Sequence, residues 1–410
     1  MIKMAIKEKY PPLPALAGDQ LVYDSACSRM IFAEYMNLFA FKEYCLRLEE
    51  LGYIKRSYRE CRDNLFCTYT GDTHMVYVYY TEYDSTVRVV CTSIDDYNSL
   101  QMLDSSTGDG EITLTQLDIG YKKQNGSPSF SGMSYAIRLS NGGFIMIDGG
   151  YNPQGETEAD NLYNWLRSQT GGERIVISAW IITHLHYDHT FTFIDFIERY
   201  RDKVEIKALI HNYPTLEYWK SMERTDLCEP WHPNCYEKYE RAVREHIDPS
   251  RIIVPHNGQV LTVGDAKIEI LHTNEDLYPK PLNKFNDSSN IFRIELAGHS
   301  LMFSGDAQVD ATRDCVSMYG EHLKSDFVQV SHHGSRKSAS VEWYKAVGAD
   351  VIMYPMGFTG ARTSEKGTPA NVYLLLKSKY REVYFGGDGA VQFKLPYKYG
   401  SSVRFSTYGQ

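Results

Sequence analysis

A string of histidines and aspartate directly after an apolar run constrains this chain more than any other feature. The run over residues 175–182 is short, rich in β-branched side chains and uncharged, which predicts a buried strand. His184, His186, Asp188 and His189 follow within six residues. Imidazole and carboxylate groups at this spacing suit zinc and similar divalent metals. A solvated, histidine-rich turn would give the same letters, but it would not explain why similar side chains end other strands of this chain.

Three other apolar runs also end in histidine or aspartate. The polar residues are Asp148, Asp306 and the adjacent pair His332 and His333. In layered α/β folds, ligands gather at the carboxyl ends of strands. Taken singly, Asp148 or Asp306 is explained equally well as the cap of a turn. Four strand ends that carry only these two residue types therefore predict one shared metal site.

The chain of 410 residues is long enough for two or three domains. The segment D-S-S-T-G-D-G has the composition of a linker, so we place a boundary at 104–111. Before it, residues 34–51 have helical spacing and three runs have strand character. This predicts a small α+β domain over 1–103, in which 1–30 form an irregular arm. The domain shows no catalytic pattern, and we expect it to pack or to bind a protein partner. Beyond the boundary, in 112–410, strands alternate with helices, which predicts an α/β domain.

The composition excludes some classes of protein. With 43% hydrophobic and 23% charged residues, the chain is typical of a globular protein in solution. A net charge of −9 without a Lys/Arg-rich run argues against long nucleic acid as a partner. No stretch reaches the roughly 18 apolar residues of a membrane span, so we predict a cytoplasmic protein without a membrane partner. The eight cysteines form no C-x-x-C pair, which predicts reduced thiols rather than a zinc knuckle.

A long aromatic and charged segment, residues 212–250, follows the metal-binding string. Part of it, residues 236–246, has helical spacing. Near a metal centre such a segment is either a lid or substrate wall, or a helical insertion on the surface. The sequence favours neither interpretation.

Four short motifs together resemble those of the metallo-β-lactamase fold hydrolases. They are I-D-G-G at 147–150, T-H-L-H-Y-D-H at 183–189, S-G-D at 304–306 and S-H-H-G-S at 331–335. The resemblance extends over about residues 112–395. The string N-D-S-S-N-I-F-R-I at 286–294 is most similar to the hydrolase domain of competence-type DNA-uptake proteins and its free-standing relatives. Secreted phosphorylcholine esterases are another similar group. The resemblance implies a four-layer αββα sandwich with a mono- or binuclear metal site, in which Zn²⁺ is favoured and Mn²⁺ or Fe is also accepted.

The same resemblance implies a role for each site residue. The first metal would be bound by His184 and His186, the second by Asp188, His189 and His333, and both by a bridging Asp306. Asp188 would also align the attacking water, and His332 would face the substrate and steer a phosphate or a leaving group. Asp148 would orient a ligand histidine by accepting its free N–H.

Two departures from the family pattern bear on this site. Many members carry a further histidine about 20 residues before the bridging aspartate, in the place where this chain reads N-D-S-S-N at 286–290 without a histidine. The first metal then either loses a neutral ligand or takes one from elsewhere, such as His211 or His272. Where relatives often have two glycines after the metal-binding string, this chain has Phe191. We expect this bulky side chain to narrow the site.

These features together predict a metal-dependent hydrolase. Two metals bridged by Asp306 would activate a water for attack, most simply on a phosphodiester of a small molecule or a short nucleotide. Hydrolysis of a lactone, thioester or amide is the alternative within the same fold. A metal-binding protein without catalysis, acting through its N-terminal domain, is the alternative outside it, and the missing histidine at Asn286 favours it.

Overall fold

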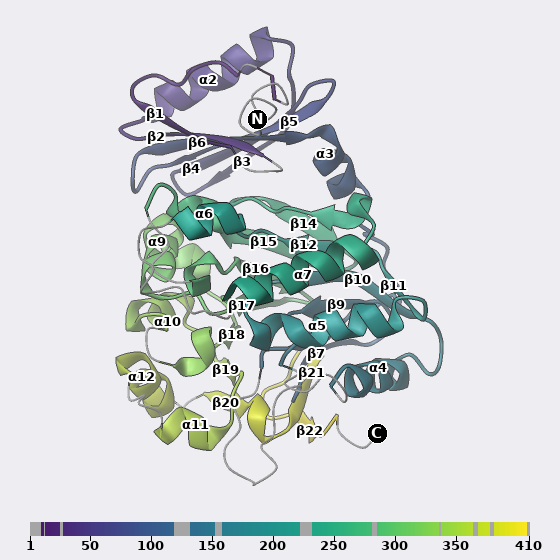
Figure 1. The fold of residues 1–410 in the computed structure, drawn as a ribbon. Coiled ribbons are helices and arrows are strands. Elements are labelled where there is room, and N and C mark those ends of the chain that lie inside the picture. The colour runs from purple at the N-terminus through teal and green to yellow at the C-terminus, as the bar shows by residue number, and fades with distance from the viewer. Residues whose placement is uncertain are drawn as a thin grey trace. The chain divides into compact units, whose positions relative to one another are not determined.

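The computed structural model describes residues 10–11, 13–24, 28–118, 132–151, 158–221, 232–280, 285–335, 338–363, 368–377 and 381–407 (Figure 1). The chain divides into two compact units. One unit consists of Met1–Met102 with Ser317–Gly320, and the other of Leu103–Val316 with Glu321–Gln410. Each unit is described by itself.

The first unit is a six-stranded antiparallel sheet in the order β1-β2-β6-β5-β4-β3, with two helices among its described residues. Its strands are β1 (Gln20–Asp24), β2 (Arg29–Ala33), β3 (Ile54–Cys61), β4 (Asn64–Thr70), β5 (His74–Thr81) and β6 (Thr86–Ser93), and its helices are α2 (Leu38–Glu50) and α3 (Ile94–Gln101). Helix α2 begins after Asn37, whose side chain accepts the N–H of Ala40, and it ends before Gly52 at φ 89°. The predicted helix over 34–51 is thus confirmed, with a later start.

The expectation of an irregular arm over residues 1–30 is wrong for 20–24 and 29–30, which lie in strands, whereas 10–11 and 13–19 form neither helix nor strand. Gln20–Asp24 pairs with Arg29–Ala33 in an antiparallel hairpin, and Arg29–Ala33 continues into the sheet beside Thr86–Ser93. The hairpin could not be predicted from the sequence, because the side chains of Gln20–Asp24 do not alternate clearly between apolar and polar.

The second unit contains two sheets. A nine-stranded sheet has the order β13-β12-β10-β9-β8-β7-β21-β22, with β11 also paired to β10, and a seven-stranded sheet has the order β14-β15-β16-β17-β18-β19-β20. The strands of the first sheet are β7 (Ile112–Gln116), β8 (Tyr135–Arg138), β9 (Phe144–Ile147), β10 (Ile175–Ile182), β11 (Val204–Ile206), β12 (Leu209–His211), β13 (Ile252–Ile253), β21 (Ala390–Leu395) and β22 (Val403–Phe405). Those of the second are β14 (Val260–Val263), β15 (Ala266–His272), β16 (Ile291–Leu296), β17 (His299–Phe303), β18 (Phe327–Gln329), β19 (Val351–Tyr354) and β20 (Glu382–Phe385).

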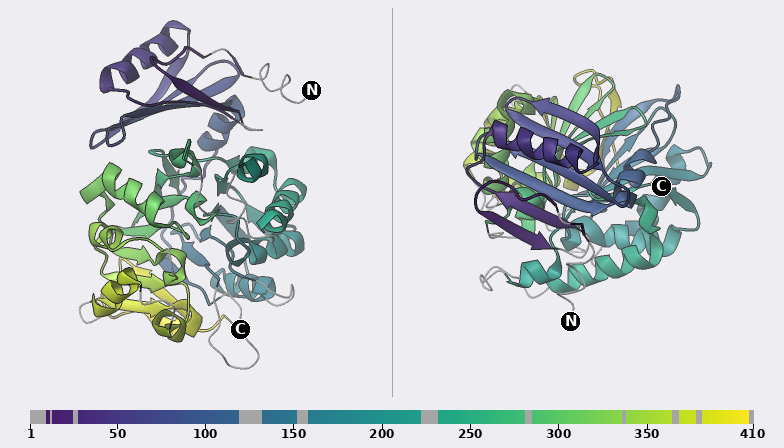
Figure 2. Two further views of the ribbon diagram at one scale, coloured as in Figure 1. Left: turned by 60° about the vertical axis from the view of Figure 1, so that its left-hand side comes forward. Right: turned by 90° about the horizontal axis from the view of Figure 1, so that it is seen from above.

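Helices lie on the outer faces of both sheets. They are α4 (Glu158–Gln169), α5 (Tyr187–Tyr200), α6 (Leu216–Ser221), α7 (His232–His246), α8 (Asn274–Leu277), α9 (Val309–Tyr319), α10 (Val341–Val347), α11 (Phe358–Thr363) and α12 (Pro369–Lys377). The left view of Figure 2 shows the blue-green helices against one sheet and the green to yellow helices against the other. Trp165, Trp180, Phe193 and Tyr239 belong to one buried apolar cluster, which joins α4, α5 and α7 to the outer face of the nine-stranded sheet.

The inner faces of the two sheets pack directly on each other. Tyr135 of β8 and Phe303 of β17 meet edge to face at 5.2 Å, and Phe327 of β18 meets Phe393 of β21 at 5.3 Å. The predicted four-layer αββα architecture is therefore confirmed. Its parallel strands matter most for function, because β9 lies beside β10 in one sheet and β17 lies beside β18 in the other.

The predicted linker is fixed to the second unit. The N–H of Gly264 donates to the carbonyl of Asp104 at 2.7 Å, and the N–H of Gly110 donates to that of Ser140 at 2.8 Å. Lys207 forms an ion pair with the Asp104 carboxylate. From Asp104 onward the backbone is therefore tied down, as its glycines and serines alone did not suggest.

Part of the aromatic segment 212–250 belongs to the outer helical layer. Helix α7 buries Tyr239, Ala242 and Val243 in the same apolar cluster as α4 and α5. This fits the helical interpretation of residues 236–246, whereas 222–231 lie outside the described residues. Six cysteines are buried and free: Cys45, Cys61, Cys67, Cys91, Cys235 and Cys315. Among the helices that the structure describes, none combines the length and apolar character that a membrane span requires.

Candidate metal centre

Strand β10 delivers the histidine string to the centre of the second unit. The strand is buried and lies parallel to both β9 and β12, so its carboxyl end opens beside theirs. The chain then turns, and α5 begins at Tyr187 with His186 at its N-cap. His184 and His186 therefore stand in the turn, whereas Asp188 and His189 occupy the first turn of a helix. A carboxylate is electrostatically favoured at that end of a helix.

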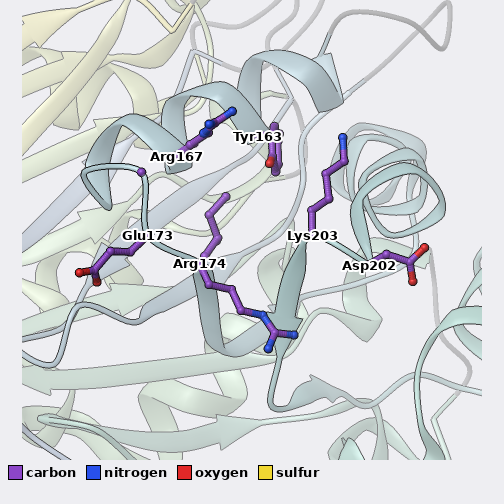
Figure 3. Close-up of a pocket in the computed structure, with 8 residues that line it drawn as sticks. Tyr163, Arg167, Glu173, Arg174, Asp202 and Lys203 are labelled. Carbon is purple, nitrogen blue, oxygen red and sulfur yellow. The ribbon is translucent and has the colours of Figure 1, made fainter.

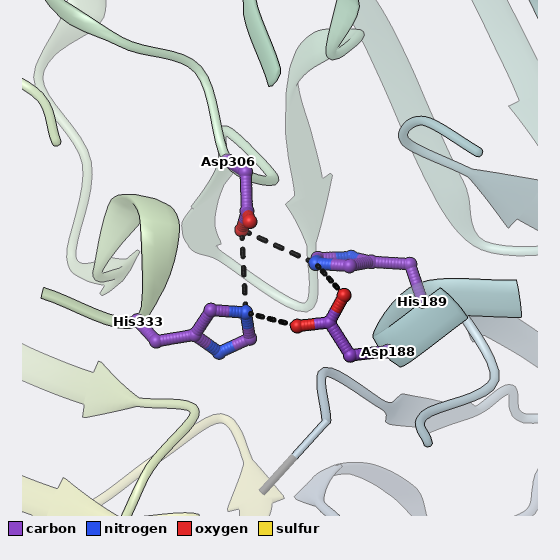
Figure 4. A group of neighbouring side chains, drawn as sticks. All are labelled: Asp188, His189, Asp306 and His333. Carbon is purple, nitrogen blue, oxygen red and sulfur yellow. Dashed lines mark ion pairs between the residues drawn. The ribbon is translucent and has the colours of Figure 1, made fainter. Parts of the chain in front are cut away.

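Side chains from the other strand ends converge on this turn. The structure brings the predicted ligands into two groups whose donor atoms lie within 4.8 Å of one another: Asp188, His189, Asp306 and His333, and His184, His186 and Asp306. Figure 4 shows the first of these groups, with His333 and Asp306 arriving from one side and Asp188 and His189 from α5. Asp306 belongs to both groups.

The two carboxylate oxygens of Asp306 face different histidines. Oδ1 lies 3.2 Å from Nε2 of His189 and 3.5 Å from Nε2 of His333. Oδ2 lies 3.9 Å from Nε2 of His184 and 3.9 Å from Nε2 of His332. The carboxylate is thus placed so that each oxygen can serve one group.

Burial and charge act against each other in this cluster. Burial opposes the ionisation of Asp306, but the neighbouring His189 and His333 hold the pKa of its carboxyl well below the usual value. Burial likewise lowers the pKa of His189, but Asp306 and Asp148 together raise it well above the usual value of an imidazole. Carboxylates and imidazoles packed this closely without water are costly unless opposite charge compensates them.

The donor set fits a divalent metal. Nε2 of His189 and Oδ1 of Asp306 are buried and only 3.2 Å apart, yet neither makes a hydrogen bond to any described residue. Both atoms face each other as ligands of a common ion would. Imidazole nitrogens with carboxylate oxygens are the ligands that zinc, iron and manganese accept.

Asp148, at the end of β9, holds His189 in place. Its Oδ2 lies 2.6 Å from Nδ1 of His189 and accepts the hydroxyl of Thr183 at 2.7 Å, and its Oδ1 accepts the N–H of Thr183 at 2.7 Å. Because Nδ1–H of His189 is committed to this carboxylate, Nε2 points into the donor group, and in the neutral imidazole that a metal binds this nitrogen carries the lone pair. This is the contact that the sequence predicted for Asp148, and the structure identifies His189 as its partner.

The pair His332–His333 divides between two positions. Nδ1 of His333 donates to the carbonyl of Pro355 at 2.8 Å, which leaves Nε2 for the donor group with Asp188 and Asp306. His332 stays outside both groups, with 22% of its side chain exposed. Nδ2 of Asn286 donates to Nε2 of His332 at 3.0 Å.

Neutral side chains that the sequence analysis did not select support the centre. Ser289 Oγ accepts the N–H of Asp306 at 3.1 Å. Nδ2 of Asn290 lies 3.1 Å from the carbonyl oxygens of Ile182, Thr183 and Asn212, so it joins the end of β10 to the end of β12. The signal was present as the string N-D-S-S-N, but amides and hydroxyls carry no metal-ligand signature of their own.

Other residues considered from the sequence lie elsewhere. Neither His211 nor His272 joins either donor group. Nδ1 of His211 instead lies 2.5 Å from the hydroxyl of Tyr239. Phe191 packs 6.1 Å from the ring of Tyr187 and beneath Lys238, partly buried against the α4–α5–α7 cluster. That Phe191 narrows the site stays a prediction.

A surface hollow of about 430 Å³ lies at the opposite end of β10 (Figure 3). Its charged lining comprises Arg167, Glu173, Arg174, Asp202 and Lys203. None of the predicted site residues lines it. Since acids and bases alternate around it, the hollow has no consistent charge preference.

Residues 128–351 match the family described as "Metallo-beta-lactamase superfamily". ComE operon protein 3 of Bacillus subtilis (strain 168) is 24% identical over 174 residues, which cover 42% of this chain and 21% of that protein. The chain thus matches about a fifth of the length of this relative.

Two solved structures are similar at lower identity. The metallo-beta-lactamase fold protein YhfI from Bacillus subtilis is 14% identical, with 67% of this chain and 95% of that chain covered and a TM-score of 0.37. CmlA, a diiron beta-hydroxylase from Streptomyces venezuelae, is 14% identical, with 72% and 54% covered and a TM-score of 0.39.

Proposed function

Because the chain belongs to the metallo-β-lactamase superfamily, we propose that it is a metal-dependent hydrolase that cleaves a phosphodiester with a metal-activated water. The observation that carries this proposal is the position of Asp306, whose two oxygens face different groups of histidines. A carboxylate placed in this way can bridge two divalent metals, an arrangement that many phosphate-cleaving enzymes use.

The donor residues of the centre form two groups, and each group would hold one ion. The first metal would be held by His184, His186 and Asp306, and the second by Asp188, His189, His333 and Asp306. When bound, such metals lower the pKa of a coordinated water to about 7 and polarise a phosphoryl oxygen. We propose zinc, since histidine nitrogens dominate the donor set, with manganese or iron as alternatives.

The protein's own groups would have separate tasks. Oδ2 of Asp188 lies 3.1 Å from Nε2 of His333, and Oδ1 lies 4.0 Å from Nε2 of His189, so this carboxylate sits between two ligands. It is placed to align the attacking water or to accept its proton. His332 has 22% of its side chain exposed, whereas the side chains of His189 and His333 are fully buried. His332 is therefore placed to contact the substrate and to steer a phosphate or the leaving group.

The substrate class rests on sequence likeness and charge. The strings S-H-H-G-S and N-D-S-S-N-I-F-R-I resemble those of competence-type DNA-uptake proteins, and the relative matched by sequence is named ComE operon protein 3. A net charge of −9 favours a small or short phosphodiester over long nucleic acid. A lactone, thioester or amide is the alternative substrate. A role of the first unit in binding a protein partner, and a cytoplasmic location, remain predictions.

The experiment that tests the proposal measures metal content and turnover together. Wild type and His186→Ala would be analysed for metal per chain by mass spectrometry and assayed with bis-p-nitrophenyl phosphate. We expect the wild type to contain metal and its turnover to depend on that metal. The variant should lose both the first metal and turnover. His246→Ala, which changes a histidine at the end of α7 outside both donor groups, should behave as wild type.

The outcomes separate the alternatives. Turnover of a lactone or thioester but not of the phosphodiester would replace the substrate and keep the enzyme. Metal without turnover on any of these substrates would favour the non-catalytic metal-binding protein. Absence of metal after reconstitution with zinc, manganese or iron would refute the proposal as a whole.

A further inference from the structure

Asn286 and His332 are joined, side chain to side chain, at the edge of the first donor group. Nδ2 of Asn286 donates to Nε2 of His332 at 3.0 Å, and Asn286 is only 4% exposed. Nε2 of His332 lies 3.9 Å from Oδ2 of Asp306, the same separation as that of Nε2 of His184 from this oxygen. His332 therefore faces the oxygen of Asp306 that serves the first group, although it is not among the donors that lie together.

The hydrogen bond and a metal would compete for the same electrons. A neutral imidazole carries one protonated nitrogen and one nitrogen with a single lone pair in the ring plane. While Nε2 of His332 accepts the N–H of Asn286, that lone pair cannot bind a metal. The first group then offers three protein donors, whereas the second offers four.

We propose that His332 is a latent ligand of the first metal and that Asn286 holds it off. In this arrangement the second metal is bound tightly and the first weakly, and His332 stays available to the substrate. The identity of one neutral side chain, Asn286, thereby sets whether the centre holds one metal or two at limiting metal concentration. No other described residue donates a hydrogen bond to Nε2 of His332.

The geometry also predicts the direction in which metal affinity changes when Asn286 is replaced, and this direction is opposite to that expected for an ordinary supporting residue. Loss of a group that merely orients metal ligands weakens metal binding by about 10- to 100-fold. Loss of the amide of Asn286 should instead tighten the first site, because it releases a nitrogen that already lies at the edge of the group. The inference rests on the metal-binding part of the proposed function and not on the choice of substrate.

The test is a double-mutant cycle read out as metal affinity. Metal-free wild type, Asn286→Ala, His332→Ala and the double variant would be titrated with Zn²⁺ in competition with a chromogenic chelator. We expect Asn286→Ala to tighten the weaker site by about tenfold or more and to leave the tighter site unchanged. The double variant should lose this gain, because the gain requires His332. Asn257→Ala removes a buried amide that donates to Asp276 at 2.8 Å, away from the donor groups, and should change neither constant.

The remaining outcomes of the titrations refute either this inference or a part of the proposed function. An unchanged or weaker first site in Asn286→Ala would overturn it, as would a gain that survives in the double variant. Failure of the wild type to bind metal would overturn it together with the proposed function. Loss of phosphodiester turnover as an activity, with the cycle intact, would refute only the substrate.

A measurement on the unaltered protein guards against variants that do not fold. Nitrogen NMR of metal-free, histidine-labelled wild type reports which ring nitrogen of His332 carries the proton, with His332→Ala used for assignment. At a pH where the imidazole is neutral, we expect the proton on Nδ1 and Nε2 as the acceptor. A protonated Nε2 would mean that the amide does not hold the lone pair, and the inference would be wrong.

Discussion

The contact between Asp148 and His189 gives the sharpest prediction about the centre. In Asp148→Asn, the amide oxygen can still accept the N–H of Thr183, and the hydroxyl of Thr183 can rotate to accept from the new NH₂ group. His189 has no such freedom, because its Nδ1–H would face a second donor. Its proton is then expected to move to Nε2, the nitrogen that faces Oδ1 of Asp306.

This change removes one ligand from the second group without altering the shape of the site. Replacement of such an orienting carboxylate costs about 10- to 100-fold in metal affinity, which corresponds to about 1.4–2.7 kcal/mol. The assay is competition with a chromogenic chelator, together with urea unfolding of the metal-free protein. The second, tighter constant should weaken by this factor.

A matched control separates this effect from a loss of buried hydrogen bonds. Asp118 is 1% exposed and accepts the hydroxyl of Ser406 at 3.0 Å and the N–H of Thr407 at 3.1 Å, and it belongs to neither donor group. Asp118→Asn should lower the free energy of unfolding by about 1–3 kcal/mol and leave metal affinity unchanged. Equal metal affinities of Asp148→Asn and wild type, or equal losses in both variants, would refute the reasoning.

Four further predictions follow from other contacts. Burial lowers the pKa of His211 to about 3, so between about pH 3 and pH 6.5 the unfolded chain binds a proton that the folded chain does not. The free energy of unfolding therefore falls by up to about 1.4 kcal/mol per pH unit as the pH decreases through that window. In urea unfolding at about pH 7 and about pH 5, the free energy of unfolding should fall less in His211→Gln than in the wild type. Gly149→Ala would place Cβ 2.4 Å from the backbone nitrogen of Phe193 and should lower the free energy of unfolding in urea by about 3 kcal/mol. An unfolding midpoint equal to that of the wild type would show that α5 shifts to make room for the methyl group. Asn290→Ala removes the amide that bridges three backbone carbonyls and should cost about 1–3 kcal/mol in the same assay; no loss would mean that water replaces it. Chelation of metal should lower the melting temperature, since a metal at about 100 times its dissociation constant stabilises by about 2.7 kcal/mol, and an unchanged temperature would argue against a bound ion.

The buried strands of the second unit were the most predictable part of the fold. Residues 144–147, 175–182 and 351–354 are uncharged runs that are apolar except at Ser178, and the structure has strands with these bounds. Such runs are buried on both faces in parallel sheets, so their burial shows directly in the letters. Residues 204–211 form two short strands, β11 and β12, which both pair in parallel with β10.

The exposed strands were not predictable in the same way. Strand β3, Ile54–Cys61, reads I-K-R-S-Y-R-E-C and lies at the edge of its sheet, where nearly all its residues are exposed. An edge strand with charged side chains gives no apolar periodicity, and its pairing with β4 is decided by the whole sheet. The six-stranded sheet therefore emerged only from the structure.

The candidate site shows the same division between charged and neutral residues. The histidines and aspartates were found because few other chemistries explain them at strand ends. Asn286 was singled out only as a departure from the family pattern, and Ser289 and Asn290 were not singled out at all, because an amide or hydroxyl becomes meaningful only once its partner is known. Their partners are His332, Asp306 and the end of β10, all distant in the sequence.

The turn that carries His332 and His333 shows how these two residues, whose roles only the family resemblance implied, come to differ. Both have left-handed backbones, at φ 47° and φ 53°, followed by Gly334 at φ 73°. Only the glycine adopts this conformation freely, and in each histidine it costs about 1–2 kcal/mol. Backbone bonds hold the turn: the N–H of His332 donates to the carbonyl of Gly305 at 3.1 Å, and the N–H of Ser335 donates to that of His332 at 2.7 Å.

This strained turn has a direct consequence for the centre. In a strand, adjacent side chains point to opposite faces, so two neighbouring histidines could not both reach one carboxylate. In the left-handed turn, Nε2 of His333 lies 3.5 Å from Oδ1 of Asp306 while Nε2 of His332 lies 3.9 Å from Oδ2. Adjacent residues thus approach the two oxygens of the same bridging group. The bonds to Pro355 and Asn286 then give them different roles, because one leaves Nε2 of His333 open and the other occupies Nε2 of His332.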